Sequence, residues 1–214
     1  MKRILATLIY LFFGFVMWSQ STVQESLSSQ INTNFTKSDS CSQLENYSKA
    51  VEYKIKEIEL RLNFNQMNPL AECGQKLGLL YYHLGKYHQS LSCFEKAASY
   101  YEHTGQQVLF ATQKVNEANV YTRLGKFPQA IHQMQLAEAV YTEDDQKFAN
   151  QLVGLYTNLG LAYFDLPNLD SASYYYDLAD ASNEIAQQEI YKAVILNNRG
   201  DIYLANDNLD EAEA

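Results

Sequence analysis

Histidines and carboxylates are the residues in this sequence whose chemistry would serve catalysis or metal binding. The four histidines, His83, His88, His103 and His132, show no HExxH or similar metal-ligand spacing. The pair Asp144–Asp145 precedes an apolar run and is typical of a helix N-cap. No G-x-S-x-G turn, phosphate-binding loop or dinucleotide fingerprint occurs. We therefore predict that the chain is not an enzyme and needs neither a metal nor a cofactor.

The composition is that of an acidic globular chain. Of its 214 residues, 47% are hydrophobic and 19% are charged, and the formal net charge is −9. That apolar fraction is enough to bury a sizeable core. Because phosphate backbones and anionic lipids repel an acidic chain, we expect no nucleic acid partner and no membrane contact apart from the N-terminal segment.

Residues 1–21 have the pattern of a signal peptide. Lys2 and Arg3 precede an uncharged, mostly apolar run over residues 4–18, and small residues follow it. As a helix this run would span about 22 Å, short for a bilayer core of about 30 Å. We predict cleavage after Ser21, or alternatively beside Gln20, and export to the periplasm or the extracellular space. An uncleaved signal segment would instead anchor the exported chain in the membrane.

A pattern recurs in four copies over residues 67–214, and the copies begin at Lys76, Asn116, Asn158 and Asn198. We call the spacing between copies the repeat period. Each copy has a small residue followed three positions later by a tyrosine, then a turn, then a second small residue. The small residues are Gly78, Ala118, Gly160 and Gly200 in the first segments and Ser90, Ala130, Ala172 and Ala212 in the second, and the tyrosines are Tyr81, Tyr121, Tyr163 and Tyr203. Because apolar residues follow helical spacing and small side chains let two helices cross closely, the pattern predicts antiparallel helix pairs.

This pattern resembles the tetratricopeptide repeat (TPR), over about three and a half repeats. The period, about 40 residues, exceeds the usual family length of about 34. It is similar to the long repeats of kinesin light chains and of bacterial regulators and sensors. The resemblance implies an all-α fold, a right-handed superhelical solenoid of antiparallel helix pairs. The last copy is incomplete from Leu209 to Ala214, so we expect a natural chain that continues, or a truncated reading frame, rather than a partner that covers this end.

Two further segments precede the repeats. Residues 22–40 are rich in Ser, Thr, Gln and Asn and are predicted to form a flexible linker. Residues 41–66 carry an apolar stripe at helical spacing, with Tyr47 and Ala50 placed one repeat period before Tyr87 and Ser90. They are predicted to form a capping helix or a degenerate repeat.

One polar position of the repeat is a candidate binding site. It lies two residues before the first small residue and holds Lys76, Asn116, Asn158 and Asn198. The resemblance implies that this part of the first helix faces a concave groove, which Asn119, Arg123 and Asn197 would also line. An Asn amide matches the main chain of an extended peptide, and kinesin light chains use a similar asparagine ladder. The alternative is that the asparagines bond between neighbouring repeats and serve packing only.

The sequence therefore predicts an exported protein–protein interaction scaffold that binds a peptide or protein in a concave groove. The alternative function is the extracytoplasmic sensor segment of a longer membrane signalling protein, such as a histidine kinase or a transcription regulator. An apolar run of about 20 residues downstream would favour the sensor. A polar capping helix and then a stop would favour the scaffold.

Cys73 and Cys93 lie on the two predicted helices of the first repeat. In an oxidising compartment they could bridge. Counted from the turn at Gly85, however, they are not level across the helix pair, and a bridge requires Cα atoms within about 7 Å. We therefore favour two buried thiols over a disulfide.

Overall fold

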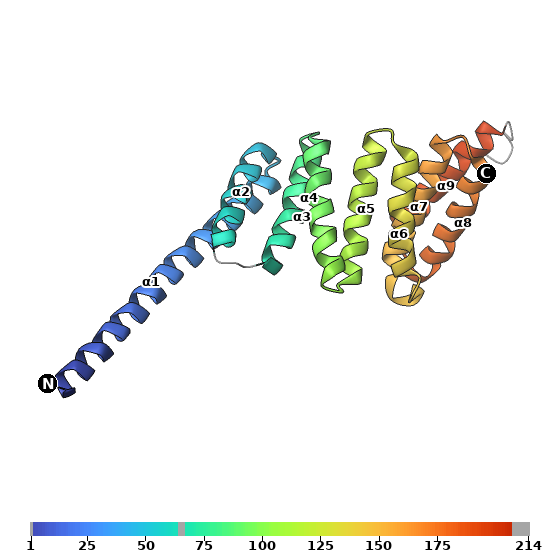
Figure 1. Ribbon diagram of the computed structural model, residues 1–214. Coiled ribbons are helices and arrows are strands. Elements are labelled where there is room, and N and C mark those ends of the chain that lie inside the picture. The colour runs from blue at the N-terminus through green and yellow to red at the C-terminus, as the bar shows by residue number, and fades with distance from the viewer. Residues whose placement is uncertain (1, 64–66, 207–214) are drawn as a thin grey trace. The chain divides into compact units, whose positions relative to one another are not determined.

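The computed structural model describes residues 2–63 and 67–206, with side chains described over 23–62 and 70–206 (Figure 1). The elements in these ranges are the helices α1 (Lys2–Gln43), α2 (Tyr47–Asn63), α3 (Met67–His83), α4 (Tyr87–His103), α5 (Gln107–Arg123), α6 (Phe127–Tyr141), α7 (Asp145–Asp165), α8 (Leu169–Ala186) and α9 (Glu189–Ala205). No strand occurs in them. The all-α helical repeat fold is thereby confirmed, and the hand of the superhelix stays a prediction.

Tight turns and caps set the helix boundaries. At the end of α5, Gly125 has a φ of +68°, and the N–H of Lys126 donates to the carbonyl of Tyr121 at 2.9 Å. This left-handed C-cap closes the last turn of the helix at little steric cost. At the start of α7, the Asp144 carboxylate accepts a hydrogen bond from the N–H of Lys147 at 3.1 Å, which confirms the predicted N-cap.

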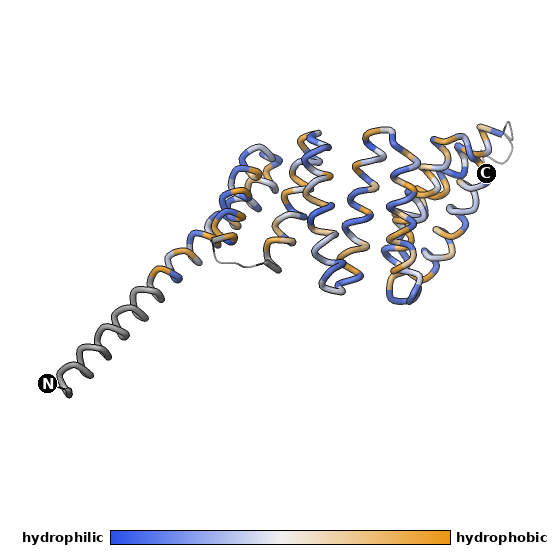
Figure 2. The backbone as a smooth tube through the Cα atoms, in the orientation of Figure 1, coloured by the Kyte–Doolittle hydropathy of each residue, from blue (hydrophilic) through white to orange (hydrophobic). Residues whose placement is uncertain are grey.

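The chain divides into two compact units, residues 1–85 and residues 86–214. In the second unit each helix from α4 to α8 packs on the next one, and α7 also packs on α9. The predicted small positions lie at the centre of this core, where Ala118, Ala130 and Ala172 are fully buried beside Ala137 and Ala179. Apolar and polar residues interleave along α5–α8, as amphipathic helices require (Figure 2).

In the first unit, α1 packs on α2 and α2 packs on α3. The prediction that residues 22–40 form a flexible linker is wrong, because these residues belong to α1. Ile31 and Ser38 are buried, and the Ser38 hydroxyl donates to the carbonyl oxygen of Ala50 on α2 at 2.9 Å. Contacts along one face of α1 therefore hold residues 22–40 against α2, although most of these residues are polar. The neighbouring helix α2 falls inside the range predicted for the capping helix, 41–66.

Two predictions concern residues outside the described side chains. Signal cleavage depends on side chains in 1–22, of which only the backbone of α1 from Lys2 onward is described. The incomplete last repeat falls on residues 207–214, which are not described. Over the described side chains, 23–62 and 70–206, no helix has the length and apolarity needed to cross a membrane.

Candidate functional site

Three of the predicted asparagines occupy equivalent places on α5, α7 and α9 of the second unit. Asn116, Asn158 and Asn198 are each half-buried. Each sits two residues before the small residue of its repeat, which is Ala118, Gly160 or Gly200, and flanks the core without entering it. The three amides therefore occupy the same repeat position on three helices.

Two of these amides already have protein partners. The Asn116 side-chain N–H donates weakly to the Gln113 side chain, at 3.4 Å within α5. The Asn198 side chain lies close enough to the Tyr176 hydroxyl on α8 to oppose the rise that burial imposes on the pKa of Tyr176. Packing is therefore part of the role of Asn198. An amide has two donors and an acceptor, so hydrogen-bonding capacity remains on each of them.

The other predicted site residues of the second unit lie on α5 and α9. Asn119 is half-buried and Arg123 is exposed at the end of α5, while Asn197 is exposed on α9. Beside Asn198, Arg199 pairs with Asp180 at 2.7 Å and with Asp177. These ion pairs link α9 to α8.

Apolar side chains accompany the asparagines on the same helix faces. Leu161 lies three residues after Asn158, and Val194 lies four residues before Asn198, which places each pair side by side on its helix. Both apolar side chains are 39% exposed. Each face thus offers an amide that can bond a main chain next to an apolar surface that can take a side chain.

Gly154 on α7 lets α7 and α9 approach each other. A Cβ on Gly154 would lie 2.8 Å from the hydroxyl of Tyr191 on α9. Gly154 is four residues before Asn158, on the same side of α7. Sequence reasoning missed this contact, because Gly154 has no counterpart at the same position of the other copies, which carry Glu72, Thr112 and Val194.

Lys76 belongs to the first unit, where its ammonium already has neighbours. Its Nζ lies 3.5 Å from a carboxylate oxygen of Glu72 and 4.5 Å from the ring centroid of Phe35 on α1. Lys76 keeps 35% of its side chain exposed. It is therefore a partly accessible cation that also holds α1 against α3.

The same unit contains a buried ionic cluster that the sequence did not lead us to expect. The Nζ of Lys54 lies 2.8 Å from one carboxylate oxygen of Glu57, and Arg61 lies 2.8 Å from the other. The Cys73 thiol donates to Glu57 at 3.3 Å. Burial raises the pKa of Glu57, but the hydrogen bonds from Lys54 and Arg61 outweigh burial and keep it below its ordinary value. The repeat register could have revealed that Lys54 and Glu57 are buried, because they lie one repeat period before the core residues Phe94 and Ala97.

The three cysteines are free thiols, and one histidine stacks on a tyrosine. Cys41, Cys73 and Cys93 are all free, and burial, together with the charge of Glu57, raises the pKa of Cys73 to about 11. His83 stacks on Tyr47 with the ring centroids 4.7 Å apart. Within the described side chains, no group of three His, Cys, Asp or Glu residues could hold a metal ion.

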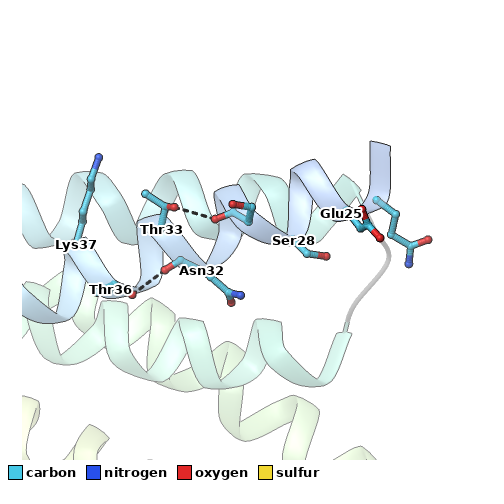
Figure 3. A pocket seen from close by; sticks show the side chains of 8 residues that line it. Glu25, Ser28, Asn32, Thr33, Thr36 and Lys37 are labelled. Atoms are coloured by element: carbon cyan, nitrogen blue, oxygen red, sulfur yellow. Dashed lines mark hydrogen bonds between the residues drawn. The ribbon is translucent and has the colours of Figure 1, made fainter. Parts of the chain in front are cut away.

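Two surface hollows lie outside the asparagine row. One, of about 880 Å³, runs along the polar face of α1, where Glu25, Ser28, Asn32, Thr33, Thr36 and Lys37 are labelled in Figure 3. The other, of about 320 Å³, lies where α8 meets α9 and is lined by acidic and amide side chains and by Lys192. Asn183 at its edge already bonds the main chain of Gln188 through both ends of its amide.

The sequence model of the soluble NSF attachment protein (SNAP) family matches residues 15–151, more than half of the chain. The chain belongs to the SNAP family. The match begins inside α1 and runs into α7, so the family includes the helix pair formed by α1 and α2. With the repeat pattern and the fold, it confirms a helical repeat protein of the TPR type.

A curated relative and two solved structures are similar to this SNAP-family chain. Protein KINESIN LIGHT CHAIN-RELATED 3 of Arabidopsis thaliana is 29% identical over 105 residues, which are 48% of this chain and only 16% of the relative. A signal transduction ATPase with a tetratricopeptide repeat sensor from Pyrococcus horikoshii has a TM-score of 0.75 at 15% identity, covering 87% of this chain and 30% of that one. The Rap conjugation gene regulator of plasmid pLS20, solved with the Phr* peptide, has a TM-score of 0.70 at 17% identity, covering 90% and 53%. At these identities the two structures share the fold.

Proposed function

We propose that this chain is an exported, non-catalytic scaffold that binds an extended peptide or protein segment along the first helices of its repeats. The observation that carries the proposal is the row of half-buried amides, Asn116, Asn158 and Asn198, with exposed apolar neighbours on α7 and α9. Peptide main chains need paired donors and acceptors that do not depend on sequence, and an amide supplies both. The structural neighbour solved with the Phr* peptide supports this use of the fold.

The binding test uses a library of immobilised synthetic peptides and the exported form of the full chain. The best binding peptide is then titrated against the double variant Asn116→Ala with Asn158→Ala. Each lost hydrogen bond should weaken binding about 3- to 10-fold. Gln129→Ala, which removes an exposed amide from α6 rather than from a first helix, is the matched control. Intact binding by a folded double variant would leave the asparagines a packing role only.

Export is proposed from the N-terminal pattern of Lys2, Arg3 and the apolar run over 4–18. N-terminal sequencing of the protein recovered from the periplasm or the culture medium should find a new terminus at or near Thr22. An intact Met1 on a soluble cytosolic protein would refute export.

A second candidate function is the extracytoplasmic sensor segment of a longer signalling protein. The tetratricopeptide repeat sensor of the Pyrococcus horikoshii ATPase, which has this fold, supports it. Both functions use the same binding surface, and they differ in the segment that would come after the repeats. The coding sequence after Ala214 decides between them, because a downstream span of about 20 apolar residues would join the repeats to an output domain.

A further inference from the structure

Helix α9 has one buried side and one open apolar side. Ile195 and Ile202 are at most 5% exposed, and among the described residues α9 packs on α7 and α8. Leu196 and Leu204, by contrast, are 57% and 52% exposed. Gly200 lies midway between these leucines, four residues from each, so the three residues follow one face of the helix. We call Leu196, Gly200 and Leu204 the α9 stripe.

The equivalent positions of α7 show what such a stripe receives. The first two residues of the α9 stripe lie one repeat period after Tyr156 and Gly160. Tyr156 is 6% exposed, and its ring centroid lies 6.1 Å from that of Tyr175 on α8. Gly160 lies so close to the ring of Tyr176 that a Cβ there would overlap it. On α7, therefore, the second helix of the same repeat covers these positions.

The sequence after α9 repeats the start of α8. Residues 208–212 read Asn-Leu-Asp-Glu-Ala, and residues 168–172 read Asn-Leu-Asp-Ser-Ala. In α8 the Asn168 side chain accepts a hydrogen bond from the N–H of Ser171 at 3.1 Å, and Ala172 is fully buried. An N-cap residue and a small residue at the same spacing predict a second helix that begins at Leu209, although residues 207–214 lie outside the described part of the chain.

We propose that the α9 stripe is the docking site for this second helix of the chain itself. The helix lies antiparallel to α9 and places a bulky side chain over Gly200, as Tyr176 lies over Gly160 on α7. A glycine at this position leaves the room that a close helix crossing needs. The occupant is the chain itself rather than a partner, because the sequence after α9 supplies the cap, the leucine and the small residue in the spacing of α8.

The proposed docking site is separate from the proposed peptide-binding surface. Asn198 lies two residues from both Leu196 and Gly200, which is about 200° around the helix. A helix on the α9 stripe therefore leaves the asparagine row open. The two proposals can fail independently, since one is read from peptide affinity and the other from the protection of α9.

The experiment completes the second helix in the full chain. Residues 173–186 of α8 replace Glu213 and Ala214, so the copy of Tyr176 comes opposite Gly200. Hydrogen exchange read by mass spectrometry should show α9 amides protected about 10-fold more than in the wild type, because burial of one leucine shifts an equilibrium by about that factor. The matched control carries the same extension with the copies of Tyr176 and Ala179 replaced by Asp, and it should add no protection.

Substitutions on both sides of the contact locate it. In the extended chain, Leu196→Asp should abolish the added protection, whereas Val194→Asp, on the face of the asparagine row, should keep it. In the chain without the extension, Ala212→Asp should speed exchange at the C-terminal end of α9. Asp210→Asn should leave that exchange unchanged, because its counterpart Asp170 on α8 is exposed.

Three results would overturn the proposal. Equal α9 exchange in the extended chain and in its Asp-substituted control would show that the α9 stripe takes no such helix. A wild-type chain that is dimeric in solution, and that Leu196→Asp converts to a monomer, would place a second copy on the stripe instead. Should the extended chain fail to fold, equal α9 exchange in the wild type and in Ala212→Asp would refute the contact.

Discussion

Helices α2 and α8 fill equivalent core positions with opposite kinds of residue, charged in α2 and apolar in α8. Both are the second helix of a pair, and in register Lys54 and Glu57 of α2 correspond to Tyr176 and Ala179 of α8. All four side chains are at most 1% exposed. The pair in α8 fills its site with a ring and a methyl group, whereas the pair in α2 buries two opposite charges.

We expect this difference to affect specificity more than stability. Burying a charge is costly, and a buried ion pair commonly stabilises no more than apolar residues of the same volume. Glu57 pairs with Lys54 and Arg61 of the same helix and accepts a hydrogen bond from Cys73 of α3. The Lys54 ammonium also lies 4.9 Å from the ring centroid of Phe35 on α1. An apolar site can pack against many different side chains, whereas this site requires polar or aromatic neighbours.

The largest effect should come from breaking this cluster at its centre. Glu57→Gln leaves Lys54 buried without a counter-charge and should cost about 3–5 kcal/mol of unfolding free energy. Urea unfolding monitored by circular dichroism measures it. Glu52→Gln is the matched control, because Glu52 pairs with Lys56 in the same helix but both are at least half exposed, and its loss should leave the unfolding free energy almost unchanged.

Replacing the whole pair sharpens the comparison. Lys54→Met with Glu57→Ala recreates the residues of α6, Met134 and Ala137. Since apolar residues of similar volume replace both charges, this double variant should be far more stable than Glu57→Gln. A double variant as unstable as the single one would mean that the charges themselves hold the unit together.

The crossing of α7 with α8 should show the next largest effect. A Cβ on Gly160 would overlap the ring of Tyr176, whereas the α5–α6 pair combines Ala118 with the slimmer Met134. Gly160→Ala should therefore cost about 1–3 kcal/mol through overpacking. Adding Tyr176→Met should recover part of that cost, as a double-mutant cycle would record. Strict additivity of the two changes would contradict this account of the crossing.

Two buried carboxylates should give opposite pH dependences. The pKa of Glu57 is lowered, so the stability it contributes is present above its ordinary pKa and is lost as pH falls through the lowered value. Burial raises the pKa of Glu117 despite its pairing with Lys114. Its contribution is therefore largest below the ordinary pKa and is lost as pH rises through the raised value.

Thermal unfolding from about pH 3 to pH 8 tests both signs, because an ordinary glutamate titrates near 4.3. Glu117→Gln should flatten the decline in stability above that pKa, and Glu57→Gln should flatten the acid-side decline. Identical pH profiles in the wild type and either variant would contradict the assigned direction for that residue.

The smallest effect concerns thiol reactivity. With its pKa raised to about 11, Cys73 is almost entirely protonated at pH 8, and the thiolate is the reactive form. It should therefore react with a disulfide reagent more slowly than the half-buried Cys41, and unfolding should make the two rates similar. Three titratable thiols in the unfolded, unreduced chain would agree with the free cysteines of the structure, and a single one would show a disulfide.

The repeat positions were predictable because small and aromatic residues recur at a fixed spacing. Ala118, Ala130 and Ala172 are buried where the pattern placed them. The positions of the asparagine row were predictable for the same reason. The proximity of Asn198 to the Tyr176 hydroxyl was not predictable, because it depends on how far a side chain of the neighbouring helix reaches.

Prediction from the sequence failed where polar residues occupy core positions. Ser38 fills the place of Gly78, but a serine in a stretch rich in Ser, Thr and Asn predicted a linker. Lys54 and Glu57 were equally hidden, because charged residues are normally exposed unless they are paired. In both cases the repeat register indicated a buried position, whereas the residue type indicated an exposed one.

We infer that the repeat architecture begins in α1, where residues 27–43 lie one repeat period before α3 (Met67–His83) and form the first helix of a complete pair. Hydrogen exchange of the full chain, read by mass spectrometry over 27–43 and over α2, is the decisive measurement. We expect amides in 27–43 to be protected to a degree similar to those in α2, and Glu57→Gln to lower protection in both segments together. Exchange of 27–43 at the rate of an unstructured chain, beside a protected α2, would refute this inference.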